Sequence, residues 1–247
     1  MPADPLSRRF NPPLWATLGT LALGAVFASL GSWQLGRSEE KAALFARFDQ
    51  GSIGTAAPAP ADGTKLETDR YAVIMASGRF DVDHQILLDA RTRDGRAGYD
   101  VLTPLVVDGA AILVNRGWVP ANPNRQKLPE IAVSDQPRAV TGLLDTLPRA
   151  ALVAGPLDIR PEMPWPRVML YPTAADIERA LGYPVRDYQL LLDAREPDGF
   201  NRSWRPALLS PQEHVGYAVQ WFALAGLLVV LYVALNWRRA PRESNPT

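Results

Sequence analysis

The sequence predicts an α+β membrane protein, a two-helix transmembrane hairpin that carries one mostly antiparallel β domain with at least one short helix. Two uncharged apolar segments lie near the chain ends, at residues 14–35 and 215–237. Each is longer than the roughly 20 residues that a helix needs to cross the hydrocarbon of a bilayer. The stretch between them, about 180 residues, is enough for one well-packed core but not for two. Short β-favouring runs separated by turn signals fill that stretch.

The first span, residues 14–35, has Trp15 and Trp33 near its two ends, and the second, residues 214–237, ends in Trp237. Aromatic residues at these depths are typical of membrane interfaces. Basic residues lie on the tail side of both spans: Arg8, Arg9, Arg238, Arg239 and Arg242. Short basic flanks stay in the cytoplasm. We therefore expect cytoplasmic tails at residues 1–13 and 238–247, and a periplasmic domain at residues 36–213 of an inner-membrane, multi-pass protein.

The first span has one competing interpretation, a cleaved signal. Ser7 to Phe10 resembles the start of a twin-arginine signal, and Val26 to Ala28 suits a signal peptidase. The apolar run continues well past Ala28, however, and is longer than the core of a signal peptide. Gly24, Ala28 and Ser32 also fall four apart, as a small-residue stripe for helix packing would.

After the first span, the mixed pattern of residues 38–50 predicts that the helix continues out of the membrane. Residues 51–65 are rich in Ala, Pro and Gly and are expected to form a flexible linker. Strands are then predicted at residues 71–76, 85–88, 101–107, 110–114, 139–144, 168–171 and 188–192. Asp108 and Gly109 form a hairpin signal, and Gly78 is expected to end the first strand.

One helix is predicted inside the domain. Thr173 and Asp176 have the spacing of a capping box, and Gly182 marks the end of the helix. Residues 147–166 carry several prolines and are expected to be irregular.

Composition excludes several classes of function. The 26 basic and 26 acidic side chains cancel, which argues against nucleic acid as a partner. The chain has no cysteine, so disulfides, thiolate metal sites and cysteine nucleophiles are excluded. No common hydrolase, metalloprotease or nucleotide-binding motif occurs, so we expect no enzymatic activity. Asp81 to His84 contains three potential metal ligands, but four residues at a turn rarely converge on one ion.

The richest group of chemical side chains lies at the predicted membrane edge. His214, Tyr217 and Trp221 are spaced to share one face of a helix, and the outer end of the first span carries Trp33, Gln34 and Arg37. In an antiparallel hairpin the two groups reach the same depth. An imidazole, aromatic rings and a cation suit a haem, with His214 on the iron and Arg37 on a propionate. The ordinary alternative is an interfacial aromatic belt with a histidine that satisfies helix-end groups.

Several segments resemble the Surfeit locus protein 1 family. They run in order along the chain: Leu30-Gly-Ser-Trp-Gln-Leu-Gly-Arg37 followed by Lys41, Gly78-Arg-Phe80, Gly98-Tyr-Asp-Val-Leu-Thr-Pro-Leu105, Val114-Asn-Arg-Gly-Trp-Val-Pro120 and His214-Val-Gly-Tyr-Ala-Val-Gln-Trp-Phe222. The resemblance extends over almost the whole chain and includes the two-span topology.

The resemblance implies a membrane-bound, non-enzymatic assembly factor for haem-copper cytochrome c oxidase that binds haem a and aids its insertion into the largest subunit. His214 matches the haem-linked histidine of that family, although Pro211-Gln-Glu213 departs from the Asn that members can carry before it. The implied partners are the largest oxidase subunit, the enzymes of haem a synthesis and the lipid bilayer.

The matching segment Asn115, Arg116, Gly117 and Trp118 has either a structural role or a partner-binding role, and we expect Gly117 to form a tight turn. Haem a, haem o and no haem all stay open. A scaffold that binds oxidase subunits without haem is the main alternative function, and a membrane-anchored enzyme is the more distant one.

Overall fold

The computed structural model describes residues 8–51, 55–62, 66–148, 159–160, 162–206 and 209–239. The chain divides into two compact units. Residues 1–45 and 207–247 make up the helix pair, and residues 46–206 make up the β domain.

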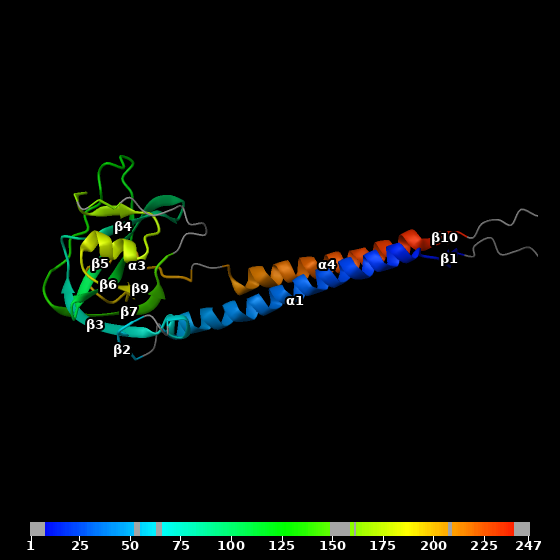
Figure 1. Cartoon of the computed structure of the whole chain (residues 1–247), viewed down its shortest axis with the longest axis horizontal. Coiled ribbons are helices and arrows are strands. Elements are labelled where there is room, and N and C mark those ends of the chain that lie inside the picture. Colours follow the sequence, from blue (N-terminus) through cyan, green and yellow to red (C-terminus); the bar gives the residue numbers. More distant parts are fainter. Residues whose placement is uncertain are drawn as a thin grey trace, which may run out of the picture. The chain divides into compact units, whose positions relative to one another are not determined.

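The helix pair consists of α1 (Leu14–Gly51), which runs on into the β domain, and α4 (Pro211–Asn236). Both helices are long and apolar enough to cross a membrane, and they lie side by side (Figure 1). The short strands β1 (Arg8–Phe10), before α1, and β10 (Trp237–Arg239), after α4, pair antiparallel at one end of the two helices (Figure 1). The predicted continuation of the first helix through residues 38–50 is confirmed. Arg242 lies outside the described residues.

Several residues in the seam between α1 and α4 have small or polar side chains. Gly31 lies directly under the ring of Phe222, since a Cβ built there would be 2.7 Å from its Cζ. Gly24 approaches Leu228 within 3.9 Å by the same measure. Ala28 and Ser32 are exposed, so the seam does not follow the expected stripe. Its small residues are Gly24, Gly31 and Ser38, which recur every seven residues.

The β domain is a barrel built from strands that are far apart in sequence. Its strands are β2 (Ala57–Pro58), β3 (Val73–Phe80), β4 (Ile86–Arg93), β5 (Arg96–Val107), β6 (Ala110–Pro120), β7 (Arg138–Thr146), β8 (Arg167–Met169) and β9 (Val185–Leu192). They lie in the order β2-β3-β7-β9-β6-β5-β4-β8, and a further pairing of β3 with β5 closes the barrel (Figure 1). Most pairs are antiparallel, whereas β2–β3, β4–β8 and β6–β9 are parallel.

The main core lies inside this barrel. Its fully buried members come from five strands and include Phe80, Leu105, Val114, Val140 and Leu190. Alternate residues of each strand face inward, as the two-residue period of a strand requires. A second cluster, around Ile86 and Leu113, packs against Ile177 of the short helix α3 (Ala174–Leu181).

The predicted capping of α3 is confirmed. Thr173 Oγ1 accepts from Asp176 N at 3.1 Å, and the Asp176 carboxylate accepts from Thr173 N at 2.9 Å. Burial acts to raise the pKa of Asp176, but the hydrogen bonds that Thr173 N and Oγ1 donate to its carboxylate, together with the charge of Arg179, outweigh burial and lower that pKa. Gly182 ends the helix at φ +81°. The predicted hairpin is also confirmed, because Asp108 and Gly109 join β5 to β6 with positive φ at both residues.

Two details differ from the sequence expectations. β3 continues through Gly78 to Phe80, because the absent side chain lets the strand approach Val106 of β5, whose carbonyl oxygen would be 2.3 Å from a Cβ. Part of the expected linker 51–65 is structured, since Ala57–Pro58 pairs with β3. Residues 52–54 and 63–65 of that linker, and residues 149–158 of the expected irregular segment, lie outside the described residues.

Candidate functional site

The second long helix begins with a complete capping box. Ser210 Oγ accepts from Glu213 N at 3.3 Å, and the Glu213 carboxylate accepts from Ser210 N at 2.6 Å. Pro211 lies in the first turn of α4, where a backbone N–H has no partner within the helix, so proline loses no hydrogen bond there. Ser38 of α1 donates to the Pro211 carbonyl at 3.0 Å. The segment Pro211 to Glu213 therefore builds a well-capped helix start directly before His214.

His214 lies in the seam of the helix pair and is only 8% exposed. Its Nδ1 is 2.8 Å from Oε1 of Gln34 on α1. An amide oxygen only accepts hydrogen bonds, so in the neutral ring Nδ1 carries the proton and Nε2 keeps its lone pair. Within the described part of the chain, Nε2 has no hydrogen-bond partner. The pair therefore presents a fixed tautomer with one free nitrogen.

The aromatic candidates are divided between the seam and the outer surface of the helix pair. Trp221 packs on Phe27 of α1 with ring centroids 5.8 Å apart. Tyr217 is 46% exposed and Trp33 is 58% exposed. His214, Tyr217 and Trp221 are expected to share one face of α4. Of these three, only His214 and Trp221 lie in the seam, and Tyr217 lies on the outer surface.

Arg37 does not contact the histidine. Its Nη1 lies 2.5 Å from the Glu40 carboxylate one turn along α1, and its side chain is 39% exposed. A surface ion pair of this kind stabilises a helix only slightly. Among the described residues, the other guanidinium N–H groups of Arg37 have no hydrogen-bond partner. Of the six side chains predicted to surround a ligand, the structure thus joins only His214 and Gln34 by a hydrogen bond.

The segment Asn115 to Trp118 lies inside the β domain, in strand β6. Arg116 is only 1% exposed and is one of the largest fully buried side chains among the described residues. Its Nε donates to the Asp198 carbonyl at 2.8 Å, and its Nη2 donates to the Ala132 carbonyl at 2.8 Å. Its Nη1 donates to Ile131 O at 2.8 Å and to Gln85 Oε1 at 3.0 Å. Burial lowers the pKa of Arg116 to about 10.

These contacts favour the structural alternative for the segment. Arg116 connects the barrel to the loop between β6 and β7 and to the loop before residue 200, and among the described residues no carboxylate accepts a hydrogen bond from it. Asn115 Nδ2 donates to Gln189 of β9 at 3.2 Å, and Trp118 Nε1 donates to the Arg91 carbonyl at 3.3 Å. No sequence pattern distinguished this buried arginine from a surface arginine.

Gly117 has the positive φ that the sequence suggested, +112°, but it does not lie in a turn. It lies in a bulge of β6, where the pairing with β5 shifts between Asp100 and Leu102. A Cβ at this position would be 2.8 Å from the Asn201 carbonyl oxygen. Only glycine fits both the backbone conformation and the contact.

The possible metal cluster at Asp81 to His84 is absent. No three His, Asp or Glu side chains in the described residues could hold an ion together. Instead, Asp81 accepts from Tyr183 OH at 2.6 Å and lies 2.8 Å from His84 Nδ1. Burial, and then this hydrogen bond, raise the pKa of Tyr183. The group connects the turn before β4 to the segment that follows α3.

Comparison with known proteins places these residues in a family context. The family model for the SURF1 family matches residues 21–226. A SURF1-like protein of Monosiga brevicollis is 27% identical over 96% of this chain and 92% of its own length. A SURF1-like protein of Rickettsia bellii is 28% identical over 84% of this chain and 85% of its own. Cytochrome oxidase assembly protein SHY1 of Saccharomyces cerevisiae is 24% identical over 71% of this chain and 48% of its own.

Proposed function

This chain belongs to the SURF1 family, and we propose that it is a non-enzymatic membrane factor for the assembly of haem-copper cytochrome c oxidase. In this proposal it binds haem a through His214 and aids its insertion into the largest oxidase subunit. A yeast relative is named as a cytochrome oxidase assembly protein. The observation that carries the haem assignment is the hydrogen bond between His214 Nδ1 and Gln34 Oε1.

This hydrogen bond fits the needs of an axial imidazole. A histidine that ligates a metal nearly always donates its other ring N–H to an oxygen, which fixes the tautomer and makes the free nitrogen a better ligand. Gln34 supplies that oxygen, and Nε2 of His214 keeps the lone pair. Haem a, when bound, would supply an iron that His214 would hold through this nitrogen.

Neighbouring side chains fit the rest of such a ligand. Tyr217 and Trp33 are exposed aromatic rings that could lie against an apolar macrocycle. Trp221 would hold the seam beside His214 through its contact with Phe27. Arg37 has guanidinium N–H groups left over from its pair with Glu40, and these suit a carboxylate such as a propionate.

The proposal is tested by the absorption spectrum of the full chain purified from cells that make haem a. His214→Ala should lose the bound haem or shift its Soret band. The matched control is His84→Ala, which removes an imidazole held by Asp81 in the β domain and should leave the spectrum unchanged. A His214→Ala protein with the parent's haem content and spectrum would refute His214 as the iron ligand, and a parent protein that carries no haem would leave the haem-free scaffold as the function.

We further propose that both tails are cytoplasmic and that the β domain is periplasmic, and that the protein's partners are the largest oxidase subunit and the enzymes of haem a synthesis. Because the chain has no cysteine, single thiols report position cleanly. Asn124→Cys, at an exposed loop position, should react with an impermeant maleimide once the outer barrier is opened. Ser244→Cys lies outside the described residues and should react only after the inner membrane is lysed. Labelling of Ser244→Cys in intact spheroplasts would contradict this orientation.

A further inference from the structure

The loop between β6 and β7 runs over residues 121–137 without a helix or strand. Loops of this length inside a compact domain are uncommon and often functional. It is nevertheless held at two places along its length. Arg116 holds the carbonyls of Ile131 and Ala132, and the Ile131 side chain is buried. Near the start, Asn122 and Asn124 each accept a backbone N–H two residues ahead. The loop is therefore built to hold one shape.

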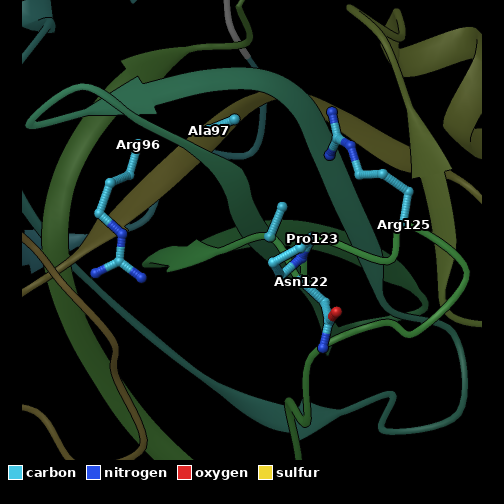
Figure 2. Close-up of a pocket in the computed structure, with 6 residues that line it drawn as sticks. Arg96, Ala97, Asn122, Pro123 and Arg125 are labelled. Atoms are coloured by element: carbon cyan, nitrogen blue, oxygen red, sulfur yellow. The ribbon is translucent and has the colours of Figure 1, made fainter.

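The start of this loop forms one wall of an open pocket of about 310 Å³ in the β domain. The pocket is lined by Arg96, Ala97, Ala121, Asn122, Pro123 and Arg125. Figure 2 shows Arg96 and Arg125 on opposite sides of Asn122 and Pro123. The volume is near the lower end of the range for small-molecule sites, which suits a small ligand rather than a cofactor.

The side chains of the pocket offer donors and no acidic acceptor. The guanidinium of Arg96 is exposed and has no partner among the described residues. Asn122 Oδ1 is already occupied, because it accepts from Asn124 N at 2.8 Å. Its Nδ2 group has no such partner in the described part of the chain. Two of the lining side chains thus present unused N–H groups.

Arg125 is positioned by its neighbours. It donates to Tyr99 OH at 2.7 Å and to Asp89 at 3.1 Å, and its guanidinium lies 5.2 Å from the centroid of the Tyr99 ring. Asp89 offsets part of its charge, so the uncompensated charge of the lining is that of Arg96. Asp94 lies in the hairpin before Arg96 but is not among the lining residues.

We propose that this pocket binds a small oxyanion, a carboxylate or phosphate group, between Arg96 and the amide of Asn122. Guanidinium and amide N–H groups are the donors that such oxygens accept, and the bonds from arginine are strengthened by its charge. Arg125, held by Tyr99, forms the far wall. The site is independent of His214 and of haem binding.

The test uses the full chain in detergent with 15N-labelled arginine side chains, titrated separately with inorganic phosphate and with succinate at low salt. The Nε–H resonance of Arg96 should shift to saturation, and the tighter of the two probes identifies the ligand class. Arg96→Ala should weaken binding about tenfold or more, through the loss of charge-assisted bonds. Arg79→Ala, an exposed arginine of β3 with Asp135 at 3.9 Å, should not weaken it.

The sharpest variant is Asn122→Asp. It keeps the Oδ1 acceptor for Asn124 N and replaces the free NH₂ group by a second carboxylate oxygen, so binding should be lost while the loop is retained. Asn124→Asp is the matched control, because it adds the same charge two residues along but outside the lining. Equal weakening by both aspartates, equal weakening by Arg96→Ala and Arg79→Ala, or no saturable shift with either probe would overturn the site.

Discussion

The helix pair and the β domain place their polar and apolar side chains in opposite positions. The helix pair exposes large apolar side chains, for example Leu21, Val219 and Leu235, and buries Ser38, His214 and Asn236 in its seam. The β domain buries its aliphatic residues in the barrel and exposes most of its charges. The two halves of one chain are thus folded for different solvents, because hydrocarbon accepts apolar surface and water does not.

Each region also buries one notable polar side chain, and the two differ in how completely they are satisfied. All three nitrogens of Arg116 donate hydrogen bonds, and no buried atom of it lacks a partner among the described residues. His214 is held only through Nδ1. A completely bonded polar group holds a fold together, whereas a half-bonded one keeps the capacity to bind a ligand.

The largest effect expected from this contrast concerns Arg116. Arg116→Met should destabilise the β domain by about 3–5 kcal/mol, because it leaves several buried acceptors without donors. Arg79→Met, at an exposed arginine, should change the free energy of unfolding by less than about 0.5 kcal/mol. Urea unfolding followed by tryptophan fluorescence measures both. An Arg116→Met variant as stable as the parent would mean that the hydrogen bonds of Arg116 do not contribute to the stability of the β domain.

The next effect separates backbone strain from crowding in the β domain. Gly117→Val adds a β-branched side chain at φ +112° and 2.8 Å from the Asn201 carbonyl oxygen, so it should cost about 2 kcal/mol or more. Gly109→Val has a similar strain at φ +81° but open space around it, and it should cost less. The same unfolding experiment compares them. Equal losses of stability in the two variants would show that the close approach to Asn201 does not add to the cost.

In the helix pair, the corresponding test removes the oxygen that orients His214. Gln34→Leu should weaken haem binding about tenfold, the usual effect of losing an outer partner of a metal-bound histidine. Gln34→Glu keeps an acceptor and should retain most of the affinity. Haem titration followed at the Soret band gives both values. If Gln34→Leu binds haem like the parent, the hydrogen bond serves only helix packing.

The smallest effect is a loss of stability at alkaline pH. Burial raises the pKa of Tyr71 and Tyr188 to about 12, so the stability they contribute is complete below pH 10 and is lost as pH rises toward 12. The lowered pKa of Arg116 acts in the opposite direction over the same range. With Tyr183 included, the net loss at pH 10 is on the order of 1 kcal/mol. Urea midpoints at pH 8 and pH 10 should differ accordingly, and the difference should shrink in Tyr71→Phe/Tyr188→Phe.

Features that depend on near neighbours in sequence were predictable. The two apolar spans, the hairpin at Asp108 and Gly109 and the capped helix at Thr173 all follow from adjacent residues. The candidate histidine was also predictable, because the start of an apolar helix and a family motif coincide at His214. The sequence also placed its partner Gln34 at the right depth of the helix pair. It did not show which way the side chains of Trp33 and Arg37 point.

By itself the sequence determined that this chain has two apolar helices around one β-rich domain, since composition and periodicity act locally. The tertiary structure decided which helix faces meet. Residues four apart drift about 40° around a helix at each step, so from Gly24 in the seam the stripe turns away from α4 at Ala28 and Ser32. The seven-residue repeat of Gly24, Gly31 and Ser38 drifts only about 20° per step and stays in the seam. It also decided that β3 closes on β5 and that Arg116 lies at the centre of the domain, because both depend on contacts between residues far apart in the chain.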